Sequence, residues 1–103
     1  SDFTFGIWDD NRIVPIAKAY FGYTDKELSK IDSFVRKNTI AKYGPVREVK
    51  KLLVFELAFD SANSSKRHKS GLALRFPRVH KIRWDKPVDE VLNLKNIKQE
   101  LLN

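Results

Sequence analysis

The sequence contains no cysteine among its 103 residues. Disulfide bonds and thiolate-bound metals are therefore excluded, and the composition is compatible with a reducing compartment. Long apolar runs are also absent, because no stretch approaches the ~18 residues needed to span a bilayer. The first ten residues have neither the basic nor the apolar region of a signal peptide. We therefore expect a cytoplasmic protein that does not interact with membranes.

Methionine is absent as well, and the chain begins with Ser1. Both features fit an excised domain better than a native start, so we expect a fragment of a longer protein. A chain of 103 residues, 42% of them hydrophobic, is long enough to bury one core and too short for two. We predict a single domain over residues 1–103.

Positive charge is concentrated in residues 64–86. This segment holds eight of the twenty Lys and Arg residues and one of the thirteen acidic residues, so its net charge is +7. The rest of the chain has twelve basic and twelve acidic residues and is neutral. Several cations on one segment indicate a polyanionic partner, whereas the alternative is an edge strand that Lys and Arg protect against aggregation. The basic residues are Lys66, Arg67, Lys69, Arg75, Arg78, Lys81, Arg83 and Lys86.

The first half of the chain predicts a hairpin followed by a helix. Residues 3–8 and 12–21 are rich in aromatic and β-branched side chains and are separated by a polar turn, as in two paired strands. Thr24 and Glu27 then form a capping box, in which the Thr24 hydroxyl accepts a hydrogen bond from the Glu27 amide. A helix should begin there and end near Asn38. Its apolar face consists of Leu28, Ile31 and Val35.

The second half of the chain returns to a two-residue period. A short strand is expected at residues 46–49 and a longer one at residues 52–60. The small, polar and basic residues 61–71 indicate a loop. A further strand is expected at residues 72–76, and Pro77 should kink it because proline lacks the amide donor. In the longer strand, the odd-numbered residues should face the core: Leu53, Phe55, Leu57 and Phe59.

Residues 88–102 have apolar side chains at roughly helical spacing, which predicts a C-terminal helix. The inventory is then about five short strands, one mid-chain helix and one C-terminal helix. This inventory is typical of a mainly β fold, the Greek-key barrel of the OB type. The mid-chain helix follows the second strand, earlier than the generic OB order, so either a strand is split or the chain enters the barrel partway.

The basic residues near the kink can form a row of phosphate-binding groups. On a regular strand Arg78 faces the side opposite to Arg75 and Arg83, unless the kink shifts the register by one. Guanidinium groups engage phosphate oxygens bidentately and Lys adds a mobile charge, so the set suits a DNA backbone or a nucleotide triphosphate. Asp85, between Arg83 and Lys86, can hold an arginine in one rotamer or orient a metal-bound phosphate. The segment therefore predicts a site with defined geometry.

Residues 75–78 (RFPR) and 83–86 (RWDK) resemble motif VI, the C-terminal signature of ATP-dependent DNA ligases. Residues 67–74 (RHKSGLAL) are similar to the lead-in to that motif. Further similar blocks occur at residues 3–8, 14–20, 22–27, 44–47 and 54–59. The resemblance covers roughly the whole chain and implies the OB-fold C-terminal domain of a bacterial or archaeal ligase.

The resemblance implies that a lysine attacks ATP, that AMP then passes to the 5′-phosphate of a nick, and that the 3′-hydroxyl displaces AMP. In this family the OB domain closes over the β- and γ-phosphates during the first step and then turns to press on the DNA minor groove. The implied catalytic residues, which orient the leaving pyrophosphate, are Arg83, Asp85 and Lys86. The implied ATP-phosphate ligands are Arg75, Arg78, Arg83 and Lys86. The implied DNA-binding residues are Lys66, Arg67, Lys69 and Lys81.

The chain departs from the family in lacking the Lys-x-Asp-Gly motif that carries the adenylated lysine: after Lys30, Ser33 stands where glycine is required. The nucleotidyltransferase domain is therefore missing, and the isolated chain should not ligate. ATP and Mg²⁺ are expected in the parent enzyme, bound mainly by that domain, and no metal or other cofactor is expected in this fragment. The expected partners are nicked duplex DNA and the nucleotidyltransferase domain of the same polypeptide, in a monomeric, nucleoid-associated enzyme.

Two other functions stay open at this point. A non-catalytic OB-type module would bind single-stranded nucleic acid through the same cations. A capping-type guanylyltransferase fits the RFPR block less well. Asp85→Ala separates the first alternative from a ligase, because a binding module should tolerate it whereas a ligase should adenylate more slowly.

Several single residues carry weaker predictions. Trp84 is expected either to stack on a base or to join the core, Phe76 to be buried, and Glu56 to be an ordinary surface charge. His68 and His80 have no partner at metal-ligand spacing, so we expect them to pack or to contact phosphates.

Overall fold

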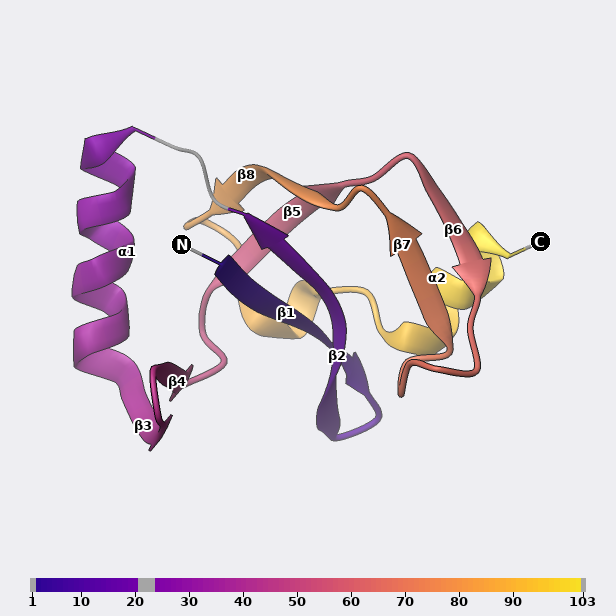
Figure 1. Cartoon of the computed structure of the whole chain (residues 1–103), viewed down its shortest axis with the longest axis horizontal. Helices are drawn as coiled ribbons and strands as arrows, with labels where there is room; N and C mark the ends of the chain where they lie inside the picture. The colour runs from indigo at the N-terminus through magenta and orange to yellow at the C-terminus, as the bar shows by residue number, and fades with distance from the viewer. Residues whose placement is uncertain (1, 21–23, 103) are drawn as a thin grey trace. The chain divides into compact units, whose positions relative to one another are not determined.

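The computed structural model describes residues 2–20 and 24–102 and is mainly β (Figure 1). These residues form eight strands, two α-helices and one short 3-10 helix. The elements in chain order are β1 (Asp2–Asp9), β2 (Arg12–Tyr20), α1 (Asp25–Asn38), β3 (Thr39–Tyr43), β4 (Val46–Val49), β5 (Val54–Ala58), β6 (Ser61–Ser64), β7 (Leu72–Arg75), β8 (Arg78–Arg83), η1 (Val88–Glu90) and α2 (Leu94–Leu101). The mainly β class and both predicted helices are confirmed. Phe21, the predicted end of the second strand, lies outside the described residues.

Contacts divide the chain into two compact units. The larger unit consists of Ser1–Phe21 with Leu53–Asn103, and the smaller unit consists of Gly22–Leu52. The single domain over residues 1–103 stays a prediction.

Antiparallel strand pairs build the larger unit. β1 pairs with β2 as the predicted hairpin, β6 pairs with β7, and β5 pairs with β8 (Figure 1). The β5–β8 pair therefore encloses the β6–β7 hairpin in sequence. Pro77 separates β7 from β8, as its missing amide donor predicts.

The core of the larger unit joins three strands and the C-terminal helix. Leu72 from β7 is fully buried and packs with Ile7, Val14 and Leu94, which belong to β1, β2 and α2. Burial of apolar side chains from elements far apart in sequence fixes the position of β7, and β8 follows β7 after two residues. The core thus determines where the basic strand lies.

The smaller unit contains α1 and the β3–β4 hairpin. Thr24 caps α1 as predicted, because its Oγ1 accepts a hydrogen bond from the Glu27 amide at 3.4 Å. Ile31, on the predicted apolar face, is 1% exposed. Gly44 has φ +60° in the turn between β3 and β4, a conformation that glycine adopts without strain. β3 was not predicted, because its residues directly follow the helix and lack a regular apolar alternation.

Replacing Thr24 with alanine should destabilise α1 by about 1 kcal/mol, the usual cost of losing an N-cap side chain. Thr24→Ser keeps the hydroxyl and should cost much less. The measurement is amide hydrogen exchange in the first turns of α1. Equal protection in the alanine and serine variants would show that the hydroxyl does not cap the helix.

The structure corrects three details, the core face of β5, the loop at residues 61–64 and the start of the C-terminal helix. Val54, on the even-numbered side, is the most buried residue of β5 at 8% exposure, whereas the odd-numbered Phe55 and Leu57 are half-buried, so both faces of β5 are partly covered. On the other face, the Phe55 ring packs edge-on against Phe5 with centroids 4.8 Å apart. Residues 61–64 form β6 instead of a loop, since their pairing with β7 outweighs their polar composition. The α2 helix begins at Leu94, where Asn93 caps it, and not at residue 88.

Phe76 also corrects a prediction, since it is 62% exposed instead of buried. Its φ of +53° places it in the left-handed region, where the chain turns from β7 toward β8. The turn removes Phe76 from the alternation of the strand. Its ring lies beside the guanidinium of Arg75, 5.1 Å from the ring centroid, in a cation–π contact.

Candidate functional site

One extra residue in β8 brings its basic side chains to one face. Glu56 pairs with Lys81 and the next residue, Leu57, pairs with Val79, so His80 is the additional residue of a β-bulge. Val79 is half-buried and Ile82 is buried, although three positions separate them. The predicted register shift therefore exists, but it lies inside β8 and not at Pro77. The residues of β8 that face away from the core are Arg78, His80, Lys81 and Arg83.

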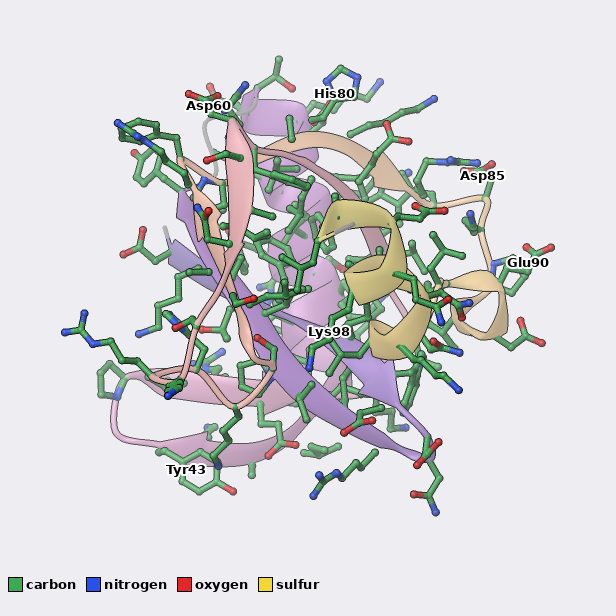
Figure 2. All side chains as sticks on the ribbon, turned by 90° about the vertical axis from the view of Figure 1, so that its right-hand side faces the viewer. Tyr43, Asp60, His80, Asp85, Glu90 and Lys98 are labelled. Carbon is green, nitrogen blue, oxygen red and sulfur yellow. The ribbon has the colours of Figure 1, made fainter. Side chains whose placement is uncertain are left out.

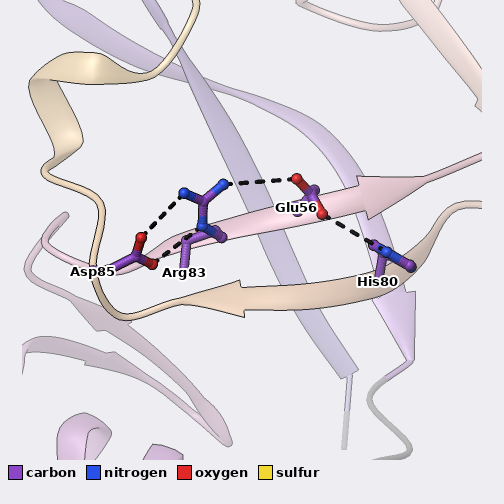
Figure 3. Close-up of polar contacts among 4 residues, drawn as sticks. All are labelled: Glu56, His80, Arg83 and Asp85. Carbon is purple, nitrogen blue, oxygen red and sulfur yellow. Dashed lines mark hydrogen bonds and ion pairs between the residues drawn. The ribbon is translucent and has the colours of Figure 1, made fainter.

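Asp85 holds Arg83 in a bidentate pair, which Figure 3 shows. Arg83 Nε donates to Asp85 Oδ1 and Arg83 Nη2 donates to Oδ2, both at 3.1 Å. The hydrogen bond from Arg83 lowers the pKa of Asp85 below its ordinary value, and the same bond raises the pKa of Arg83. Arg83 is only 29% exposed, whereas Asp85 on the following turn is 71% exposed. The carboxylate thus holds the guanidinium in one orientation.

Glu56 approaches the same guanidinium from β5 and was missed as a site residue. Its Oε1 lies 3.8 Å from Arg83 Nη1, and its Oε2 lies 3.8 Å from His80 Nε2 (Figure 3). The sequence separates Glu56 from Arg83 by 27 positions, so no local spacing indicates this contact. The register of β5 against β8 is the signal that predicts it.

Lys86 completes a shallow, open hollow of about 490 Å³ that is lined by Arg83, Asp85, Lys86 and Glu90. The Lys86 amide donates to the Arg83 carbonyl at 3.2 Å, which turns the chain after β8. The segment that follows is fixed to β1, because the Trp8 indole donates to the Val88 carbonyl at 3.2 Å. The sequence-predicted trio of Arg83, Asp85 and Lys86 is therefore gathered at one place.

Arg78 begins β8, at the end opposite to Arg83, and Arg75 is the last residue of β7. Arg78 and Arg83 are five positions apart along the strand, roughly 16 Å. Figure 2 shows Asp60 and Asp85 on different sides of the molecule. Arg78 Nη1 donates to Asp60 Oδ1 at 3.0 Å and to the Phe76 carbonyl at 2.8 Å. The four implied phosphate ligands thus form two groups, Arg83 with Lys86 and Arg75 with Arg78.

Three of the four implied DNA-binding residues project from the turn between β6 and β7. This turn is closed by hydrogen bonds from the Ser65 amide to the Gly71 carbonyl at 2.9 Å and from the Gly71 amide to the His68 carbonyl at 3.0 Å. His68 Nδ1 lies 2.7 Å from Ser65 Oγ, so this histidine has a structural partner. The exposed cations on the turn are Lys66, Arg67 and Lys69. Lys81, exposed on β8, is the fourth implied DNA ligand.

No group of three or more acidic, histidine or cysteine side chains capable of holding a metal occurs in residues 2–20 and 24–102. The same part of the chain contains no helix long and apolar enough to cross a membrane. The hollow beside Arg83 combines a guanidinium and an ammonium group with two carboxylates. Of these groups, the guanidinium and the ammonium are the ones that can donate hydrogen bonds to a phosphate.

The model of the family described as "ATP dependent DNA ligase C terminal region" matches residues 1–86. The chain belongs to this family. This ligase C-terminal region is 42% identical over 96% of its length to a "Probable DNA ligase" from Koribacter versatilis, and 43% identical over 88% to one from Opitutus terrae. It is 33% identical over 92% of its length to a "DNA ligase" from Methanoculleus marisnigri. It spans 17%, 9% and 17% of these relatives, respectively.

The family agrees with the OB-type fold predicted from the strand inventory. The matched range, residues 1–86, ends at the last residue of the RWDK block and includes every implied site residue. The match to the family therefore covers both blocks that resemble motif VI.

Proposed function

We propose that this ligase C-terminal region works within a longer ATP-dependent DNA ligase, where it orients the ATP phosphates during adenylation and holds duplex DNA during sealing. The observation that carries the proposal is the bidentate Arg83–Asp85 pair beside Lys86 at an open hollow. The guanidinium is preorganised there before a phosphate arrives. The ligase would act as a monomer on chromosomal DNA, with the nucleotidyltransferase domain of the same polypeptide as its intramolecular partner.

In the adenylation step, a lysine nitrogen of the nucleotidyltransferase domain bonds to the α-phosphorus of ATP, and the bond to the bridging oxygen of pyrophosphate breaks. Negative charge develops on the leaving pyrophosphate. Arg83 and Lys86 would stabilise that charge through preoriented donors, the largest contribution that a protein makes to phosphoryl transfer. Mg²⁺ would supply further charge neutralisation from the nucleotidyltransferase domain.

DNA contact would use a separate group of cations. Lys66, Arg67 and Lys69 project from a hydrogen-bonded turn, and Lys81 is exposed on β8. Such residues neutralise backbone phosphates without reading sequence. Each neutralised phosphate adds about 0.9 to the slope of log affinity against log salt on duplex DNA. We therefore propose weak, salt-sensitive binding by this region alone.

The test uses the full-length parent polypeptide with ATP and Mg²⁺. We expect its intact mass to increase by one AMP and the adenylated protein to seal nicked duplex DNA. It should also bind nicked duplex in preference to single strands, with affinity falling as salt rises. A folded polypeptide that gains no AMP and prefers single strands would instead support the non-catalytic binding module.

A further inference from the structure

Glu56 occupies the one edge of the Arg83 guanidinium that Asp85 leaves open. Asp85 takes the edge formed by Nε and Nη2, at 3.1 Å from each nitrogen. Glu56 Oε1 faces Nη1 at 3.8 Å, which is an ion-pair distance and too long for a hydrogen bond. Carboxylates thus flank the guanidinium from two elements, as Figure 3 shows.

The two carboxylates differ in how firmly the fold holds them. Asp85 lies on a turn after β8 and is 71% exposed. Glu56 lies inside β5, its backbone is paired with Lys81 across the β5–β8 ladder, and it is 47% exposed. A strand fixes a side chain more closely than a turn does. The backbone of Glu56 is therefore held more firmly than that of Asp85, although Asp85 makes the closer contacts to Arg83.

His80 engages the other oxygen of the same carboxylate. Its Nε2 lies 3.8 Å from Glu56 Oε2, and His80 is the extra residue of the bulge. The carboxylate is thus placed between a ring nitrogen and a guanidinium, one on each oxygen. In this position Oε1 of Glu56 is the oxygen that faces Arg83.

We propose that Glu56 is a positioning residue for Arg83 in the adenylation reaction, a role that rests on the proposed function of Arg83. Glu56 would not touch ATP. It would face the Nη1 edge of the guanidinium while Asp85 bonds to the opposite edge. The Arg83 side chain would then lose less rotational freedom when it binds the leaving pyrophosphate. The long contact to Nη1 leaves that nitrogen free of a formal hydrogen bond to Glu56 and able to donate to phosphate.

The experiment is Glu56→Gln in the full-length ligase, a substitution that keeps shape and removes charge. We expect enzyme–AMP formation at saturating ATP to slow about fivefold, the upper range for an exposed ion pair. Glu56→Asp, which restores the charge on a shorter side chain, should recover part of the rate. Sealing of nicked DNA that already carries AMP should stay within twofold of the wild type, because that step does not use the leaving pyrophosphate.

The control is Glu48→Gln, which removes another strand carboxylate with a closer ion pair, to Lys51 at 2.8 Å, in the smaller unit. It should leave enzyme–AMP formation unchanged. In an Arg83→Ala background, Glu56→Gln should cause no additional loss, because a positioning residue acts only through its target. Equal losses in both backgrounds, or no loss in the wild-type background, would overturn the role of Glu56. If Arg83→Ala itself leaves adenylation intact, the proposed function of Arg83 fails first.

Discussion

Replacing Arg83 with alanine in the full-length ligase should slow enzyme–AMP formation about 100-fold, the range observed when one preoriented donor to a developing oxyanion is removed. The reason is the geometry of the pair with Asp85, which aligns the guanidinium beside Lys86 before ATP binds. The measurement is the single-turnover rate of AMP attachment followed by intact mass. Sealing of pre-adenylated nicks should change far less than the first step.

Two variants define the specificity of this result. Arg12→Ala removes an exposed arginine that pairs with Asp9 at 3.5 Å in the β1–β2 turn, and its rate should stay within twofold of the wild type. Arg83→Lys keeps the charge but loses the planar fork, so we expect an intermediate rate. If Arg83→Ala and Arg12→Ala behave alike, the guanidinium of Arg83 does not contact the leaving group.

Replacing Leu72 with alanine should lower the free energy of unfolding by about 3 kcal/mol, within the usual 2–5 kcal/mol for a fully buried leucine. Leu72 is 0% exposed and packs with Ile7, Val14 and Leu94, so the deleted atoms leave a cavity between three strands and α2. Its backbone amide and carbonyl are both bonded to the buried Ser70 hydroxyl, which limits how far the site can collapse. The measurement is urea unfolding of the chain followed by circular dichroism.

Leu92→Ala is the matched control for that measurement. Leu92 is half exposed, in the segment between η1 and α2, and its truncation should change the stability by no more than about 0.5 kcal/mol. A loss for Leu72→Ala as small as the loss for Leu92→Ala would mean that the core around β7 is not packed as described.

Elements with a strong local signal were predictable from the sequence. The β1–β2 hairpin has a polar turn between two apolar runs, and α1 has a capping threonine, so both were located to within a few residues. β6 was missed because Ser, Ala and Asn have little strand preference and this segment pairs only through tertiary context. β3 was missed although Thr, Ile and Tyr favour strands, because it directly follows α1 and lacks a regular apolar alternation. Phe76 was placed in the core because a two-residue period was continued through a turn whose left-handed backbone no local pattern indicates.

In the candidate site, too, contacts between residues close in sequence were predictable and contacts between strands were not. Asp85 lies two residues after Arg83, so the sequence indicated that it could hold an arginine in one rotamer, and the structure shows this pair. The sequence left open the other role, orienting a metal-bound phosphate. Glu56 reaches Arg83 across two strands that are adjacent only after folding, so no sequence pattern indicated it. The separation of Arg78 from Arg83 likewise depends on the length of β8 and not on residue type.

The extra residue at His80 also determines which alignments of β8 are possible. Without the bulge, side chains would alternate regularly after Val79, so Lys81 and Arg83 would point to the core face, where Ile82 is now buried. Burying two cations without partners is far more costly than leaving one backbone residue unpaired. The charges that we propose to bind phosphate therefore also prevent the strand from slipping, so the same side chains specify the alignment of β8.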